Sequence, residues 1–267
     1  MQNDYQRYRP LLPSYFLDLF SGIGGFHLGA QWAGLQFDAH YYSEVDPYAI
    51  KVYAKRFPNA IGLGDITKVY GRALPKGDWI IAGGFPCQDI SVAGKGAGLA
   101  GKRSGLWYEY ARLIGELRPR FAIMENVGAL TFRGLDAVLG SLAEIGYDAE
   151  WQDIRASDVG APHRRERIWI VAYPSSERRD TTREREIRSE RKGKAYPPRK
   201  QSDNRADNLC LLREWYTDSE IPGDVGGDVR VSDIMDRLKC LGNSIVPQIA
   251  QLIFEQSDFD EWRKNAE

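Results

Sequence analysis

The chain has 267 residues, of which 43% are hydrophobic and 27% are charged, a composition typical of a water-soluble globular domain with room for a small appended lobe. No run approaches the roughly 20 consecutive apolar residues of a membrane-spanning helix, and the first residues lack a secretory signal, so we expect a cytoplasmic protein with no membrane partner. The formal net charge of −1 does not exclude nucleic acid, because binding depends on where the basic side chains lie.

Short apolar runs alternate with helix-period segments over the first two thirds of the chain. Strands are predicted at residues 15–20, 39–43, 79–82, 121–125 and 168–172. Helices are predicted between them at residues 24–33, 47–57, 106–117 and 135–145. This alternation predicts an α/β fold with a mixed, mostly parallel, Rossmann-like sheet and crossover helices.

The pattern changes at Pro174. Residues 175–205 hold almost no large apolar side chain, and they carry eleven basic and six acidic residues. Two interpretations stay open for this segment: a solvated insertion, or a basic strip that binds DNA phosphates. An amphipathic helix is predicted again at residues 245–254.

A glycine-rich turn follows the first predicted strand, where residues 18–26 read Asp-Leu-Phe-Ser-Gly-Ile-Gly-Gly-Phe. Glycines let the backbone approach a ligand closely, and the following helix N-terminus offers unpaired N–H groups. The spacing lacks the third glycine of the dinucleotide fingerprint, so the turn alone does not identify its ligand. Glu44 ends the second strand, where a carboxylate can accept both hydroxyls of a ribose. Asp65 is placed either to cap a turn or to accept a hydrogen bond from an adenine amino group.

Cys87 lies in a Phe-Pro-Cys-Gln run between the predicted strand 79–82 and the glycine-rich stretch 93–101. The end of a parallel strand beside a flexible loop is where α/β enzymes place reactive groups, although a lone cysteine is more often a small buried apolar residue. Cys87 and the two other cysteines, Cys210 and Cys240, form no CxxC pair. We therefore expect free thiols and no metal site.

Two further segments carry candidate catalytic side chains. Glu125 ends the strand 121–125 in the run Glu-Asn-Val and is a candidate acid beside a thiol. Arg165 and Arg167 share a parity, so they project to one side of an extended segment, and guanidinium groups suit carbonyl or phosphate oxygens. Taken singly, each arginine is more readily explained as a surface charge.

In combination and in this order, these runs resemble the cytosine-5 DNA methyltransferase family. The resemblance covers residues 15–173 and about 236–256. The matching blocks are the DLFxGxGG turn at 18–25, the GDI block at 64–66, the GFPCQxxS loop at 84–91, the ENV block at 125–127 and the late Leu-Gly-Asn-Ser block at 241–244.

The resemblance implies a sheet of the S-adenosylmethionine-dependent methyltransferase type, with S-adenosylmethionine as methyl donor and duplex DNA as substrate. Cys87 is then the nucleophile that adds to C6 of a flipped-out cytosine. Glu125 would hold N3 and the exocyclic amine, and Arg167, helped by Arg165, would bind O2. The positions that match the family's cofactor contacts are Phe20, Gly22, Ile23, Gly25, Glu44, Val45, Asp65, Ile66, Pro86, Leu106 and Asn243.

The resemblance also divides the chain. We expect a catalytic and cofactor-binding domain at 1–173, a reduced, partly flexible target-recognition region at 174–235, and a C-terminal helix at 236–267 that returns to the catalytic domain. We expect a monomer, of phage, prophage or restriction-modification type, with a cognate restriction endonuclease acting on the same DNA site without a stable complex. His163 stands where the family usually has glutamine, which predicts a changed orientation of the arginine pair.

Two alternatives stay open. One is a catalytically impaired relative that still binds DNA, with the short recognition region as its damaged part. The other is a transfer-RNA cytosine-5 methyltransferase, although the Cys-Phe-Thr run that this branch usually carries is not present before the last helix. A nicotinamide-dependent oxidoreductase would explain the glycine turn but neither Pro-Cys-Gln nor Glu-Asn-Val.

Overall fold

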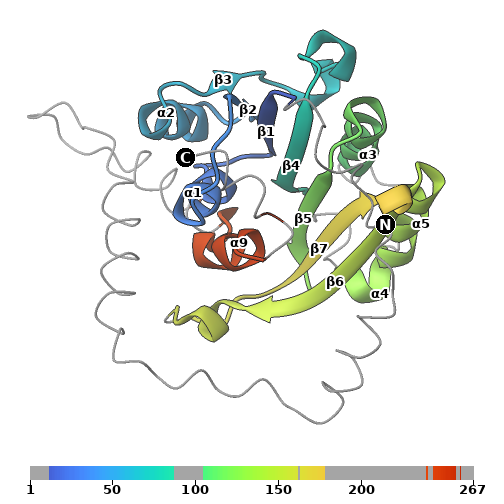
Figure 1. Ribbon diagram of the computed structural model, residues 1–267. Coiled ribbons are helices and arrows are strands. Elements are labelled where there is room, and N and C mark those ends of the chain that lie inside the picture. Colours follow the sequence, from blue (N-terminus) through green and yellow to red (C-terminus); the bar gives the residue numbers. More distant parts are fainter. Residues whose placement is uncertain are drawn as a thin grey trace, which may run out of the picture.

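The computed structural model describes residues 12–86, 105–161, 163–177, 239, 243–256 and 259. Within these residues one seven-stranded sheet has the order β3-β2-β1-β4-β5-β7-β6 (Figure 1). The strands are β1 (Ser14–Leu19), β2 (Ala39–Ser43), β3 (Ile61–Gly62), β4 (Asp78–Gly84), β5 (Phe121–Val127), β6 (Tyr147–Arg155) and β7 (Glu166–Pro174). The first five strands pair in parallel, whereas β7 runs antiparallel to both of its neighbours. The mixed, mostly parallel sheet is therefore confirmed.

Helices cover both faces of this sheet (Figure 1). One face carries α1 (Gly25–Trp32), α2 (Pro47–Arg56) and α9 (Pro247–Phe254), and the other carries α3 (Leu106–Leu117), α4 (Leu130–Arg133) and α5 (Leu135–Glu144). Short 3-10 turns are η2 (Ile66–Lys68), η3 (Gly71–Ala73), η5 (Ala156–Val159) and η6 (Ser175–Glu177). In the part of the chain described here, no helix has the length and apolar character needed to cross a membrane.

The sequence pattern missed β3, β6 and α4. β3 has only two residues, and α4 only four, which is too short for a periodic signal. β6 is an edge strand whose sequence, Tyr-Asp-Ala-Glu-Trp-Gln-Asp-Ile-Arg, has few buried positions. Its first six residues, Tyr147 to Gln152, nevertheless alternate between apolar and polar, a pattern typical of a half-buried strand, so this strand could have been predicted.

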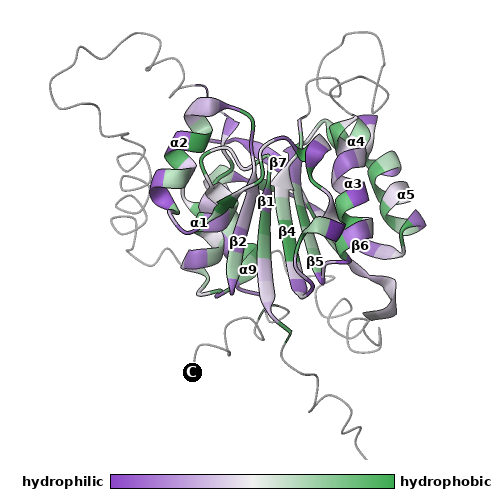
Figure 2. Ribbon diagram, turned by 90° about the horizontal axis from the view of Figure 1, so that it is seen from above, coloured by the Kyte–Doolittle hydropathy of each residue, from purple (hydrophilic) through white to green (hydrophobic). Residues whose placement is uncertain are grey.

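Alternation along the strands divides the core into two layers. Leu17 and Leu19 of β1 pack on the side of α3 and α5, while Phe16 packs on the side of α1 and α9. Figure 2 shows the same arrangement from above, with hydrophobic central strands between helices that present hydrophilic residues outward. Burial on both faces explains why the central strands read as continuous apolar runs in the sequence.

The C-terminal helix α9 packs closely against α1. A Cβ atom added to Gly29 would lie 2.6 Å from Cβ of Ala250, and one added to Gly25 would lie 2.6 Å from Cγ1 of Ile245. Only glycine permits this approach, because real Cβ atoms are not found at such distances. The contact brings the segment before α9 beside the glycine turn that follows β1.

Candidate active site

The carboxyl ends of β1, β2, β4 and β5 lie at one edge of the sheet, here called the carboxyl edge. Because β7 runs in the opposite direction, its first residues lie at the same edge, where Arg167 pairs with Val127. On the neighbouring strands Gly84 pairs with Glu125, and Gly83 pairs with Leu19. The fold therefore brings together segments that are far apart in the sequence, as the order of the motifs predicts.

The turn after β1 adopts an unusual backbone. Phe20 has a φ of 51°, Gly22 of 53° and Gly24 of 89°. This left-handed region is readily available to glycine and rare for a bulky residue such as phenylalanine. A Cβ atom added to Gly22 would meet no atom within 4 Å. The middle of the turn thus faces open space, which suits the close approach of a ligand to the backbone.

The Glu44 carboxylate is held by the backbone around it. Its Oε2 accepts a hydrogen bond from the Gly22 N–H at 2.8 Å, and its Oε1 accepts from the N–H groups of Val45 at 2.7 Å and Asp46 at 2.9 Å. Glu44 thereby links the glycine turn to the end of β2. A carboxylate has about four lone-pair sites, so it can still accept hydroxyl groups of a ligand.

Asp65 caps the 3-10 turn η2. Its Oδ1 accepts hydrogen bonds from the N–H and the hydroxyl of Thr67, both at 2.9 Å. These bonds lower the pKa of Asp65, with the backbone N–H of Thr67 as the largest cause. The turn-cap interpretation is confirmed, and both of these bonds use the same oxygen. Ile66 is buried in the core with 3% of its surface exposed, so a ligand beside η2 would meet its backbone.

The other residues expected at the cofactor lie around the same edge with different exposure. Ile23 and Gly25 are buried, Phe20, Pro86 and Leu106 are partly buried, and Val45 and Asn243 are exposed. Val45 exposes 67% of its surface, so its side chain is accessible to a ligand.

Glu125 is the buried acid of this edge, with 8% of its surface exposed. Its Oε1 lies 3.1 Å from Nε of Arg167. Burial raises the pKa of the Glu125 carboxyl, and the positive charges of Arg167 and Arg165 act in the opposite direction. A Cβ atom on Gly84 would lie 2.9 Å from Oε2 of Glu125, so the glycine at the end of β4 leaves room for the carboxyl.

Asn126 connects the end of β5 to the segment that follows β4. It is buried, its Nδ2 donates a hydrogen bond to the Phe85 carbonyl at 3.2 Å, and its Oδ1 accepts one from the Val127 N–H at 2.8 Å. Its place in the Glu-Asn-Val block is the one sequence signal for this structural role. Phe85 and Pro86 are the last described residues before Cys87, which lies outside the described residues.

The segment before α9 returns to this edge. Lys239 forms an ion pair with Asp46, with 2.6 Å between Nζ and Oδ2, and Ile245 lies against Gly25. His163 is exposed. The glycine-rich stretch 93–101, the basic segment 178–205, Cys210 and Cys240 lie outside the described residues. Among the residues that are described, no three His, Cys, Asp or Glu side chains form a group suited to a metal ion.

Comparison with known proteins identifies the family of this arrangement. The family model described as C-5 cytosine-specific DNA methylase matches residues 15–214. The chain is 40% identical over 161 residues to the type II methyltransferase M1.ScrFI of Lactococcus lactis subsp. cremoris, a match that covers 59% of this chain and 41% of that protein. It is 35% identical over 162 residues to the type II methyltransferase M.HhaI of Haemophilus parahaemolyticus, covering 59% and 48% respectively. The chain thus matches less than half the length of these relatives.

Solved structures share the fold. A prophage-encoded E. coli protein described as a DNA modification methyltransferase superposes with a TM-score of 0.50 at 29% identity, over 61% of this chain and 47% of that one. A variant of Spodoptera frugiperda DNMT2 superposes with a TM-score of 0.52 at 23% identity, over 61% and 50% of the two chains. With the family model matching well over half of its residues, the chain belongs to the C-5 cytosine-specific DNA methylase family.

Proposed function

We propose that this chain transfers a methyl group from S-adenosylmethionine to C5 of cytosine in duplex DNA. The observation that carries the proposal is the buried Glu125 carboxyl facing Arg167 at the carboxyl edge, where β4 delivers the segment that leads to Cys87. A protonatable acid, a cation for a carbonyl oxygen and a thiol are the three groups that this chemistry needs.

The residues around the ends of β1 and β2 and around η2, here called the cofactor half of the carboxyl edge, fit S-adenosylmethionine. The open backbone at Gly22, the exposed Val45 and the carboxylates of Glu44 and Asp65 suit a nucleoside with a zwitterionic tail. Glu44 would take the ribose hydroxyls, and Asp65 the adenine amino group. The remaining walls of the cofactor site would be formed by Phe20, Ile23, Gly25, Ile66, Pro86, Leu106 and Asn243. When bound, the cofactor supplies an electrophilic methyl group on a positively charged sulfur.

The mechanism assigns one task to each catalytic side chain. The Cys87 thiolate adds to C6 of a cytosine that has left the base stack, while Glu125 donates a proton or a hydrogen bond to N3. The raised pKa of Glu125 fits this task because a buried carboxyl holds its proton more readily. Arg167, supported by Arg165, stabilises the negative charge that gathers on O2. The C5 carbon takes the methyl group, a base removes the C5 proton, and the returning electron pair expels Cys87.

The division of the chain follows from the same proposal. Residues 1–173 would form the catalytic and cofactor-binding domain, 174–235 a reduced target-recognition region, and 236–267 the returning C-terminal segment. The protein would act as a cytoplasmic monomer on duplex DNA, with a restriction endonuclease acting on the same site as a functional partner that forms no stable complex with it.

Covalent trapping tests the chemistry. Duplex DNA that contains 5-fluorocytosine in a randomised sequence pool is incubated with the protein and S-adenosylmethionine. Fluorine at C5 cannot leave as a proton does, so the adduct to Cys87 persists through denaturing electrophoresis. We expect an adduct with the wild type and with the control Cys210→Ser, and none with Cys87→Ser.

The outcome of this test also separates the alternatives. An absence of adduct with every sequence in the pool would overturn methyl transfer and favour a DNA-binding relative without activity. Transfer of labelled methyl groups to transfer RNA and not to duplex DNA would overturn the substrate assignment. Bisulfite sequencing of DNA from cells that express the protein then gives the target sequence.

A further inference from the structure

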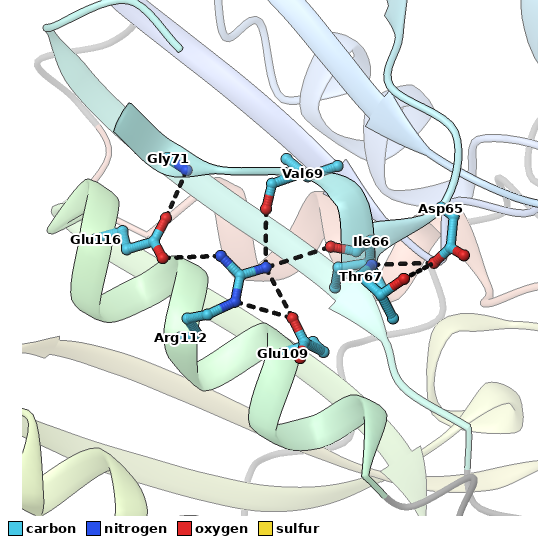
Figure 3. Close-up of polar contacts among 8 residues, drawn as sticks. All are labelled: Asp65, Ile66, Thr67, Val69, Gly71, Glu109, Arg112 and Glu116. Carbon is cyan, nitrogen blue, oxygen red and sulfur yellow. Dashed lines mark hydrogen bonds and ion pairs between the residues drawn. The ribbon is translucent and has the colours of Figure 1, made fainter. Parts of the chain in front are cut away.

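Arg112 lies in the middle of α3 and reaches the segment that carries Asp65. Its Nη2 donates hydrogen bonds to two backbone carbonyl groups of this segment, that of Val69 at 2.8 Å and that of Ile66 at 3.3 Å. Figure 3 shows the guanidinium between α3 and η2, with the two carbonyls on the side of η2. These carbonyls belong to Ile66, the first residue of η2, and to Val69, its C-cap.

Two carboxylates on the same helix fix the direction of the guanidinium. Glu109, three residues before Arg112, accepts from Nε at 2.8 Å, and Glu116, four residues after it, accepts from Nη1 at 2.8 Å. The side chains of these three residues are 28 to 33% exposed. The two carboxylates therefore hold the planar guanidinium group in the orientation in which Nη2 points to the carbonyl groups.

Glu116 adds a third attachment. Its Oε2 accepts a hydrogen bond from the Gly71 N–H at 2.6 Å, and a Cβ atom on Gly71 would lie 2.7 Å from Cβ of Glu116. The backbone from Ile66 to Gly71 is thus joined to α3 at three points through two side chains. The buried face of α3 in turn anchors the helix to the sheet.

The sheet forms few hydrogen bonds with this segment. β3 pairs with β2 only at Ile61 and Gly62, and the last contacts before η2 are those of the Leu63 N–H with the Tyr42 carbonyl and of the Ser43 hydroxyl with the Gly64 carbonyl. After these contacts, Asp65 is placed by its own cap, by the burial of Ile66 and Val69 in the core and by the attachment of this segment to α3.

We propose that Arg112 is a positioning residue for the adenine end of the cofactor site. It sets the distance between two walls of that site, η2 with Asp65 on one side and α3, which begins at Leu106, on the other. The inference rests on the proposed function, because Asp65 and Leu106 are assigned there to S-adenosylmethionine. It adds a residue that would touch neither cofactor nor DNA and yet determines cofactor affinity.

Binding of S-adenosylhomocysteine, the demethylated product, tests this role by calorimetry on the full chain. Arg112→Met keeps the length of the alkyl stem and removes every hydrogen bond of the guanidinium. We expect its Kd to rise about tenfold, with KM for S-adenosylmethionine rising more than kcat falls. Arg112→Lys keeps the charge near Glu109 and Glu116 but cannot bond two carboxylates and two carbonyls at once, so it should recover the Tm and not the Kd.

Two comparisons distinguish positioning from a general loss of stability. Arg118→Met is the matched control, because Arg118 ends the same helix and donates to the Ile145 carbonyl, away from η2. It should lower the Tm and leave the Kd unchanged. An S-adenosylhomocysteine analogue that lacks the adenine amino group should bind the wild type more weakly, and Arg112→Met should reduce that difference.

The results separate failure of the inference from failure of the proposed function. Equal Kd values for the wild type and both Arg112 variants would overturn the positioning role while leaving methyl transfer intact. An equal rise in Kd for Arg118→Met would overturn it as well. A wild type that binds neither S-adenosylmethionine nor S-adenosylhomocysteine would overturn the proposed function, and the inference with it.

Discussion

The two halves of the carboxyl edge hold their carboxylates in different ways. The cofactor half is formed by β1, β2 and η2, and the base half is formed by β5 and β7. Glu44 and Asp65 accept hydrogen bonds from backbone N–H groups. Glu125 is buried and faces guanidinium groups. Backbone groups are fixed by folding, whereas an arginine side chain keeps rotamer freedom that is lost when it is held in one position. The cofactor half is therefore pre-organised by the fold, and the charge state of the base half depends on a few side chains.

This difference leads to separate expectations for the two halves. Substitutions in the base half should change the rate of the chemical step and its pH dependence. Substitutions in the cofactor half should change cofactor affinity and stability.

Removal of the buried acid should have the largest effect. Glu125→Ala is expected to lower kcat about a thousandfold, because a positioned acid contributes roughly 10²–10⁴ in rate. The fold should persist, because the substitution also removes the free-energy cost of burying a carboxyl group. Single-turnover transfer of labelled methyl groups to DNA measures the rate. Glu150→Ala, on the exposed side of β6, is the control, and a Glu125→Ala rate within tenfold of the wild type would contradict the assignment.

Removal of the guanidinium that faces this acid should have the next largest effect. Arg167→Met is expected to lower kcat about a hundredfold, the usual loss for one donor at a developing negative charge. The pKa of Glu125 should rise further without Arg167, so the limb of the pH–rate profile that reports Glu125 should move to higher pH. A lower rate with an unmoved profile would mean that Arg167 acts on the substrate alone.

Acid should destabilise the region beneath the cofactor half. His27 stacks between His40 and Phe57, with ring centroids 4.0 and 3.8 Å apart. Burial lowers the pKa of His27 to about 2 and that of His40 to about 4. Both values lie below the ordinary 6.5, so the unfolded chain binds more protons in acid and stability is lost as the pH falls below 6.5. Each histidine should cost about 2 kcal/mol by pH 5.

Urea unfolding at pH 7, 6 and 5 measures this loss. His40→Phe keeps an aromatic ring beside His27 and cannot be protonated, so it should remove about half of the dependence on pH between 7 and 5. A variant whose stability falls as steeply as that of the wild type would show that carboxyl groups account for the acid sensitivity.

The smallest effect is expected at Glu44. Glu44→Gln replaces a charged acceptor of three backbone N–H groups with an amide that has a single oxygen, and the Kd for S-adenosylmethionine should rise about tenfold, or roughly 1.4 kcal/mol. Calorimetric titration measures it. Asp136→Asn, in the first turn of α5 on the opposite face of the sheet, should leave the Kd unchanged, and equal effects of the two substitutions would indicate a general loss of stability.

Much of the fold could be predicted because its periodicity is strong. The central strands are buried on both faces, and the predicted strand at residues 39–43 matches β2 residue for residue. The edge strand β6 was missed although Tyr147 to Gln152 alternate between apolar and polar residues. The direction of β7 was equally hidden, since a parallel and an antiparallel strand of this length read alike in a sequence.

The site was predictable to the extent that its residues stand in recognisable runs. Glu125 was recognised by its place at a strand end, and Arg165 and Arg167 by their shared parity. The ion pair between Glu125 and Arg167 could not be predicted from local patterns, because it depends on the register of β5 and β7. The contacts of Arg112 span more than forty residues of sequence, and no local pattern reports a side chain that bonds to distant carbonyl groups.

The reversal of β7 has a consequence for how the protein can be altered. β7 starts at the carboxyl edge and ends at the opposite one, whereas the segment at Ile245 returns beside Gly25. Glu177 and Lys239, the described residues on either side of the segment 178–238, therefore both belong to the same sheet domain. Closing a flexible loop costs only about 0.6 kcal/mol more for each doubling of the loop length. Segments of very different size can thus be exchanged at this point while the sheet and its edge stay intact.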